Sequence, residues 1–354
     1  LFAGTEFGLF VTYDGGTTWR AVTGGVPRVR VDDIVIHPVR GDLILGTHGR
    51  SIIVLDDVTM LAAGAPVTDR AALYPVLAAR QRFVTRVLPT PGARNFQAPN
   101  PAEGALLTYA LGTPANAADT VARVTITDAS GAVVRSMTVP GRAGLHRTNW
   151  DLHHDRPAGV TDADEGWFGA PKGSWVAPGR YTVTLAARGT QVSQALEVLA
   201  DDRLPIAADA ASARHRASRR LAELLTAFNG GVQLHAALVA ERKRIEDGAA
   251  GTPRRDSLAT LLRETRTALD SLGRRFGGGF GGAKFGFLDL DGSLQASSTA
   301  PTVAQERALE QLGTKLREDL RALNALLAGS MAELRRRDAG GASGLTPVPI
   351  PPSD

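Results

Sequence analysis

The sequence predicts a multidomain protein of mixed β and α structure. We expect partial β-propeller blades, then an Ig-like β-sandwich, then a C-terminal antiparallel helical hairpin or three-helix bundle. Three observations predict this order. A β-hairpin pattern occurs twice before residue 58, six short strand patterns follow between residues 105 and 199, and apolar residues recur at three- and four-residue steps after residue 208.

The first segment, residues 1–58, contains two near-copies of one pattern. Leu1–Val11 and Leu43–Val54 each run through apolar residues to Gly-Thr, cross a short polar turn, and enter a second apolar run. Their offset of about forty residues is the period of a four-stranded propeller blade. One or two blades cannot close a ring. Because Leu1 also lies inside a strand pattern without an initiator Met, we expect the chain to be the C-terminal part of a longer protein.

A specific turn motif follows the first near-copy. Its fixed positions are Thr12, Asp14, Gly16, Thr18 and Trp19. We expect the Asp14 carboxylate to fold back onto backbone N–H groups, glycine to supply a positive φ, and Trp19 to wedge between neighbouring sheets. The sequence therefore predicts a structural role for this turn.

The middle of the chain contains a connecting segment and a sandwich. Residues 59–103 are poor in pattern and are expected to form a connecting segment with one or two strands, and Pro99–Gly104 marks a boundary. Residues 104–200 hold six strand patterns, with Asp128–Gly131 as a hairpin turn between two of them. Six or seven strands in about a hundred residues are typical of an Ig-like sandwich.

The last part of the chain, residues 207–338, is predicted to be helical. Apolar stripes indicate one long or kinked helix that continues through Gly230 and Gly231, and two further helices. Thr302 and Gln305 have the spacing of a capping box at the start of the last one. Residues 277–298 are predicted to form a glycine-rich loop, and the proline-rich residues 339–354 a disordered tail.

Composition limits the function classes. The chain has 0 cysteines, so disulfides, thiolate metal sites and cysteine nucleophiles are excluded. Its net charge of +4 invites a nucleic-acid interpretation, but the basic residues are interspersed with acidic ones and aromatics make up 5%. We therefore expect no nucleic-acid partner. No run has the length of a membrane-spanning helix.

His48 and Arg50 are the best candidates for a binding site. They lie in the predicted turn of the second near-copy, where they could project toward one propeller face. The alternative is structural: His48 bonds a neighbouring turn, and Arg50 pairs with Asp56 or Asp57. The carboxylate pairs Asp32-Asp33 and Asp56-Asp57 are more typical of turns and caps than of catalysis, and no catalytic residue is predicted.

Potential metal ligands are densest at His153, His154 and Asp155. Adjacent residues on a strand point to opposite faces, so the two histidines are poorly placed to hold one ion. Asp289-Leu-Asp291-Gly lacks the closing Glu of a calcium loop. The glycine-rich stretch lacks the Lys and Ser/Thr of a phosphate-binding loop. We expect no metal and no cofactor.

The complete order of motifs resembles a known family. The Asp14 turn is similar to the Asp-box of sialidase-type and sortilin-like propellers, and Asp33–Pro38, Gly46–Ile52 and Leu55–Asp57 resemble the last blade of bacterial sortilin-like, BNR-repeat propeller proteins. Gly144–Leu152 and Ala177–Val183 resemble the FlgD-type Ig domain that follows this propeller, and Ala300–Gln305 resembles the start of its last helix. His153-His154 and the glycine-rich stretch 277–282 depart from the family pattern. The resemblance implies an exported location: periplasmic, cell-envelope or secreted.

Two functions are consistent with these residues. The first is a non-catalytic interaction or scaffold role, with a protein or carbohydrate bound at the propeller face. The alternative follows from the family's usual label of glycosyl hydrolase, with an active site mostly in blades outside this chain. Nucleic-acid binding by the basic helices is the least favoured, and the oligomeric state is left open.

Overall fold

The computed structural model describes residues 1–64, 70–83, 102–112, 120–161, 164, 172–204, 206–276, 283–296, 298–338 and 344–353. The protein has mixed β and α structure, as predicted. It divides into two compact units, which are described separately. The β unit contains residues 1–82, 89–152 and 178–202, and the helical unit contains residues 83–88, 153–177 and 203–354.

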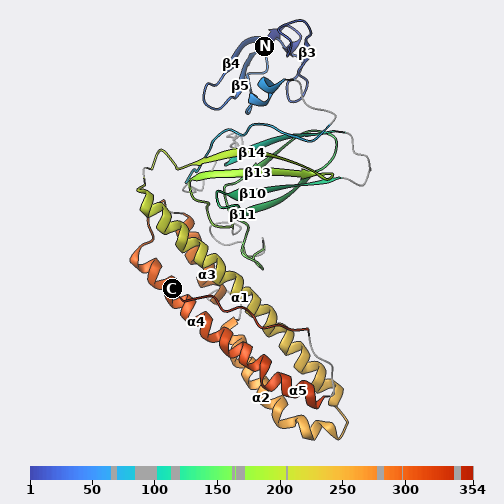
Figure 1. Ribbon diagram of the computed structural model, residues 1–354, viewed down its shortest axis with the longest axis vertical. Helices are drawn as coiled ribbons and strands as arrows, with labels where there is room; N and C mark the ends of the chain where they lie inside the picture. The colour runs from blue at the N-terminus through green and yellow to red at the C-terminus, as the bar shows by residue number, and fades with distance from the viewer. Residues whose placement is uncertain are drawn as a thin grey trace. The chain divides into compact units, whose positions relative to one another are not determined.

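The β unit begins with two three-stranded antiparallel sheets (Figure 1). The first has the order β1-β2-β3 and the second β4-β5-β6. The two near-copies form the hairpins β1–β2 and β5–β6. The bounds are β1 Phe2–Thr5, β2 Gly8–Val11, β3 Arg20–Ala21, β4 Val31–Ile36, β5 Leu43–Thr47 and β6 Ile52–Leu55.

These two sheets share one apolar core. Leu9 of β2 lies in it with Leu43 and Leu45 of β5, all of them almost fully buried. Gly4 of β1 lies so close to β4 that an added Cβ would be 2.8 Å from the carbonyl oxygen of Val31. The core therefore covers one face of the β4-β5-β6 sheet with the sheet that precedes it in sequence.

Two further sheets complete the β unit. A five-stranded sheet has the order β11-β10-β13-β14-β8, and a three-stranded sheet has the order β12-β9-β7. All six strand patterns predicted between residues 105 and 199 are strands, and the connecting segment adds β7 and β8. The bounds are β7 Ala72–Leu73, β8 Ala79–Arg80, β9 Ala105–Leu111, β10 Val121–Asp128, β11 Val133–Pro140, β12 Gly144–Trp150, β13 Gly179–Ala187 and β14 Thr190–Leu199, with a 3₁₀ turn η1 at Thr59–Ala63.

Large side chains connect these two sheets. Trp150 of β12 is fully buried and meets Tyr181 of β13 edge to face, with ring centroids 5.6 Å apart. The hydroxyl of Tyr109 on β9 donates to the carbonyl oxygen of Pro140 at the end of β11, 2.9 Å away. Burial raises the pKa of Tyr109 to about 12, so this donor keeps its proton at neutral pH.

The helical unit contains five helices among its described residues. Their bounds are α1 Ala208–Ala249, α2 Arg254–Phe276, α3 Ala283–Gln295, α4 Val303–Ala328 and α5 Ser330–Arg337. The predicted stripes supply the core: Leu221, Leu225 and Phe228 on α1, Leu258 to Leu272 on α2, and Leu309 to Leu334 along α4 and α5. The capping box at Thr302 and Gln305 is confirmed.

Gly230 and Gly231 lie within one uninterrupted helix, as predicted. Gly231 is the point where three helices approach closely. An added Cβ there would be 2.6 Å from the Phe276 ring and 2.9 Å from the Leu320 side chain. Close packing thus offsets the helix-propensity cost of about 1 kcal/mol for a glycine.

Two predictions about the helical unit are wrong. Residues 283–295, expected within a loop, form α3, because Phe287, Leu290 and Leu294 bury an apolar face in the bundle core. Residues 277–282 and 297 lie outside the described residues. Residues 344–353 of the expected disordered tail hold a defined course against the helices, with Leu345 and Val348 packed on the core. Residues 339–343 and 354 are outside the described part.

Candidate functional site

The turns at the tips of the two hairpins are built alike. The Thr5 hydroxyl donates to the carbonyl oxygen of Gly8, 3.0 Å away, and the Thr47 hydroxyl donates to that of Ser51, 2.6 Å away. In both turns the threonine fastens the outgoing strand to the returning one. The residues between these anchors therefore project outward, and Phe7 is 67% exposed.

His48 and Arg50 occupy the second of these turns. Both are exposed, and the His48 amide donates to the carbonyl oxygen of Arg30, 2.9 Å away. Neither side chain makes a hydrogen bond or an ion pair with another residue in the described part of the chain. The alternative pairing of Arg50 with Asp56 or Asp57 is therefore wrong.

The carboxylate pairs near these turns have structural contacts. Asp32 pairs with Arg30 at 2.5 Å, and the Asp33 carboxylate accepts from the Ile34 amide. The Asp57 carboxylate lies just before the 3₁₀ turn and accepts from the amide and the hydroxyl of Thr59. The backbone carbonyls of Asp56 and Asp57 accept from the guanidinium of Arg147 on β12, at 2.6 and 2.7 Å. Asp32 and Asp33 lie within β4, so the expected role in turns and caps does not apply to that pair.

An apolar surface lies next to the His48 turn. Val35, Ile44 and Val54 are direct neighbours across β4, β5 and β6, so they share one face of that sheet. Ile52 lies two residues before Val54 on the same face and is 68% exposed; Val54 is 51% exposed and Val35 49%. We call these four residues the bare face, because the opposite face of the sheet is covered by the shared core.

The Asp14 turn has the geometry expected from its sequence. One carboxylate oxygen of Asp14 accepts from the Thr18 amide and the Thr12 hydroxyl, both at 2.8 Å, and the other accepts from the Thr18 hydroxyl at 2.6 Å. The Thr12 hydroxyl also accepts from the Gly16 amide at 2.9 Å, and Gly16 has φ +103°. These bonds, that of the Thr18 hydroxyl first, hold the pKa of Asp14 well below its usual range. The turn is thus a self-contained structural unit.

Trp19 does not wedge between sheets, which corrects our expectation. The residue is 42% exposed, and its ring lies 3.9 Å from the place a Cβ would take at Gly16. Within the described residues, the shared core is formed on the side of Leu9 and Leu45 and does not include Trp19.

His153 and His154 lie in the helical unit and diverge, as adjacent strand-like residues should. The His153 ring is buried 4.0 Å from the Trp175 ring, whereas the His154 ring lies 5.5 Å from that of His215. Burial lowers the pKa of His215, the hydrogen bond to the Trp175 carbonyl partly opposes this, and nearby arginines lower it further. Asp155 is exposed, and no cluster of three metal-ligating side chains occurs in the described part of the chain.

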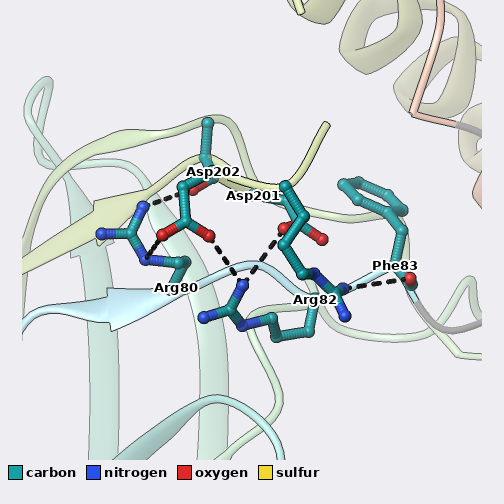
Figure 2. A network of polar contacts seen from close by, with 7 residues as sticks. Arg80, Arg82, Phe83, Asp201 and Asp202 are labelled. Atoms are coloured by element: carbon teal, nitrogen blue, oxygen red, sulfur yellow. Dashed lines mark hydrogen bonds and ion pairs between the residues drawn. The ribbon is translucent and has the colours of Figure 1, made fainter. Parts of the chain in front are cut away.

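Sequence reasoning missed one polar network of the β unit (Figure 2). The ends of β8 and β14 run parallel, and there the Arg82 guanidinium contacts Asp201 at 3.2 Å and Asp202 at 2.7 Å. Arg80 donates to the carbonyl oxygen of Ala200 and pairs with Asp202. The opposite charges of Arg80-x-Arg82 and Asp201-Asp202 are the only sequence signal, and no pattern brings these distant segments together.

Comparisons with known proteins place the chain in no family. No protein-family model and no curated protein matches it. The crystal structure of dimeric latent PorU from Porphyromonas gingivalis is similar at a TM-score of 0.20 and 16% identity, over 45% of this chain and 12% of that one. The BSP domain of a biofilm associated protein is similar at a TM-score of 0.19 and 11% identity, over 56% and 23%.

These similarities are too weak to show a shared fold. The chain also spans less than a quarter of the length of either structure. Neither comparison supports membership in the Asp-box propeller family, so that relationship enters below as a proposal. No helix in the described residues has the length and apolar character needed to cross a membrane.

Proposed function

We propose that this chain is a non-catalytic interaction module from an exported Asp-box propeller protein. In this proposal, residues 1–58 are the last part of a larger β-propeller, and the sheets formed by β7 to β14 are an Ig-like adaptor. The resemblance of the Asp14 turn and of the later motifs to sortilin-like, BNR-repeat proteins supports the family and an exported location.

The bare face of the β4-β5-β6 sheet carries the proposal. The opposite face of the same sheet is covered by the sheet β1-β2-β3, which belongs to the same internal repeat. Two neighbouring sheets of the repeat therefore already pack face to face. We infer that the occupant of the bare face is a further sheet of this repeat, because contiguous exposed apolar surface favours burial.

A footprinting experiment tests this proposal. Carbene labelling is applied to the 354-residue chain and to the product of the entire gene. We expect Ile52 and Val54 to be labelled in the former and protected in the latter. Val121 and Val133, exposed apolar residues on β10 and β11, are the control positions and should be labelled in both. Equal labelling of Ile52 and Val54 in the two proteins would contradict the proposal.

The glycoside hydrolase reading is the second candidate function. The unpartnered His48 and Arg50 side chains favour it, since an exposed guanidinium and imidazole can donate hydrogen bonds to an anionic sugar. A double variant, His48→Ala with Arg50→Ala, in the product of the entire gene should then reduce hydrolysis of sialyl or uronyl aryl glycosides. Absence of any such hydrolysis by the unaltered gene product would end this second candidate.

A further inference from the structure

The C-terminal segment, residues 344–353, runs back along α1 and α4 of the helical unit (Figure 1). Its half-buried residues are Leu345, Val348 and Pro351, and the others are exposed. This burial recurs at every third residue, the repeat of a polyproline II helix that lies with one edge on a surface. The segment is thus laid down in a regular way although it has no helix or strand.

Proline spacing explains this conformation. The sequence from Thr346 to Pro352 is Thr-Pro-Val-Pro-Ile-Pro-Pro. Proline fixes its own φ near −65°, and each residue that precedes a proline is restricted to extended conformations. The segment therefore loses little conformational entropy when it is bound, as in other recognition of proline-rich peptides.

Asn324 of α4 recognises the backbone of this segment. Its side-chain amide donates to the carbonyl oxygen of Val348, 2.8 Å away, and its side-chain oxygen accepts from the amide of the same residue at 3.0 Å. Between Thr346 and Pro352 only Val348 and Ile350 retain a backbone N–H, because the other positions after Thr346 are prolines. Asn324 thus satisfies both backbone groups of one of these two residues.

A second polar contact with α4 lies four residues further along the segment, at Pro352. The guanidinium of Arg317 donates to the carbonyl oxygen of Pro352 at 3.3 Å and is steadied by the Thr314 hydroxyl at 3.0 Å. From Asn324 to Arg317, α4 advances about 10 Å. From Val348 to Pro352, a polyproline II helix advances about 12 Å. The two spacings match, so an extended segment reaches both side chains without distortion.

Gly230 of α1 lies against the same segment. An added Cβ there would lie 3.2 Å from the Val348 side chain, which is tighter than ordinary contact. Leu345 and Val348 pack against the core of the bundle. The absence of a side chain at Gly230 is therefore what admits Val348.

We infer that Gly230, Arg317 and Asn324 form a recognition groove for an extended, proline-spaced peptide, and that the chain's own C-terminal segment occupies it as an intramolecular ligand. In this groove Asn324 and Arg317 form hydrogen bonds with backbone groups of the peptide, and Gly230 leaves room for one small apolar side chain.

A cleavage and exchange experiment tests this inference. A protease-recognition sequence is inserted between Gly341 and Ala342 of the full chain, and the protein is cleaved after folding. A fluorescent synthetic peptide of residues 344–354 is then added. We expect saturable binding of one peptide per chain, and at least tenfold weaker binding by Asn324→Ala and by Gly230→Leu. Gln311→Ala removes an exposed amide from the same helix and should bind normally.

The Gly230→Leu variant should block binding without unfolding the protein. Leucine is a better helix former than glycine, so α1 is retained while the place of Val348 is filled. Circular dichroism checks helix content in every variant. Hydrogen exchange of the Val348 amide in uncleaved Asn324→Ala should be faster than in the unaltered chain.

Four outcomes would overturn the inference. The first is no saturable binding by a cleaved chain whose helices are intact, and the second is equal binding by all variants. The third is loss of the helices on cleavage, which would make the segment an integral part of the fold. A dimer of the uncleaved chain whose segments exchange between copies would overturn the intramolecular assignment.

Discussion

Thr5 and Thr47 perform the same task at equivalent places of the two hairpins. Each hydroxyl donates across its turn to a carbonyl oxygen at the start of the returning segment, that of Gly8 or that of Ser51. The repeat visible in the sequence thus extends to individual hydrogen bonds. It also determines which residues face outward at the hairpin tips.

Replacing either threonine by valine should loosen its own turn only. Valine keeps the β-branched shape and removes the hydroxyl, and each hydrogen bond lost is worth about 1 kcal/mol. Thr47→Val removes the bond to Ser51, whereas Thr5→Val removes both the bond to Gly8 and the one from Phe7. Thr5→Val should also speed exchange of the Phe7 amide, which donates to the Thr5 hydroxyl at 3.1 Å. Hydrogen exchange followed by NMR measures this effect, with Thr17→Val as the control because that hydroxyl lies in the Asp14 turn. An unchanged Phe7 rate would contradict the prediction.

The Asp14 turn should be sensitive to acid. The folded pKa of Asp14 is depressed, chiefly by the Thr18 hydroxyl, below the unfolded value of about 3.9. The stabilisation by Asp14 is therefore complete above the unfolded pKa and is lost as the pH falls through the folded pKa. We expect protection of the Thr18 amide to fall at low pH in the unaltered chain. In Asp14→Asn it should be weak at every pH, whereas Glu6→Gln should behave like the unaltered chain.

Asp291 should make the helical unit less stable as the pH rises. Burial on α3 raises its pKa to about 7, although the Gln295 amide donates to it at 2.6 Å. The folded state therefore holds a proton that the unfolded state has released above about pH 4. The free energy of unfolding should fall between about pH 4 and pH 7 and stay constant above that. The total loss is at most about 1.4 kcal/mol for each unit by which the folded and unfolded pKa values differ.

Asp291→Asn should remove this decline and raise the thermal midpoint at pH 8. Thermal unfolding followed at 222 nm, at pH 5 and pH 8, measures the difference. The exposed Asp289 of the same helix provides the control Asp289→Asn, which should leave the pH dependence unchanged. A parallel pH profile of the Asp291 variant and the unaltered chain would refute the assignment.

The ion pair between Arg335 of α5 and Glu241 of α1 should be costly to break. The guanidinium contacts both carboxylate oxygens, at 2.8 and 2.5 Å, and both side chains are largely buried. Glu241→Gln leaves a buried guanidinium without its counter-charge, which costs about 3–5 kcal/mol. Arg335→Lys cannot make both bonds and should also destabilise.

A matched control exists on the same helix. Arg337 pairs with Glu333 one turn away, and its side chain is exposed. Arg337→Gln should cost less than about 1 kcal/mol, since exposed pairs contribute little. Urea unfolding monitored by helix content compares the variants, and a similar loss for Arg337→Gln and Glu241→Gln would count against the prediction.

Periodicity predicted most secondary structure, because repeating burial leaves a repeating sequence. The hairpins at Leu1–Val11 and Leu43–Val54, the six later strands and the helix through Gly230 all follow such patterns. The Asp14 turn was predictable for a different reason: its hydrogen bonds join residues only two to four positions apart, so the whole motif is visible in one short stretch.

Contacts between distant segments were not predictable from one sequence. Glycine and proline content predicted a loop before residue 298 and a disordered tail after residue 339. In both places the burial of apolar side chains determined the structure instead. Phe287, Leu290 and Leu294 are buried on α3, and Leu345 and Val348 of the C-terminal segment pack on the same core. At the candidate site, the sequence indicated the turn of His48 and Arg50. It did not indicate the bare face, because exposure of Ile52 depends on what covers the sheet.

The two consecutive glycines of α1 face different neighbours. Gly231 turns toward Phe276 and Leu320, and Gly230 turns toward Val348. A methyl group at position 231 would push helices apart, whereas one at position 230 would meet only the C-terminal segment. An alanine at position 231 would therefore disturb the packing of the helices, whereas an alanine at position 230 would disturb only the binding of the C-terminal segment. The two properties can evolve, or be engineered, separately.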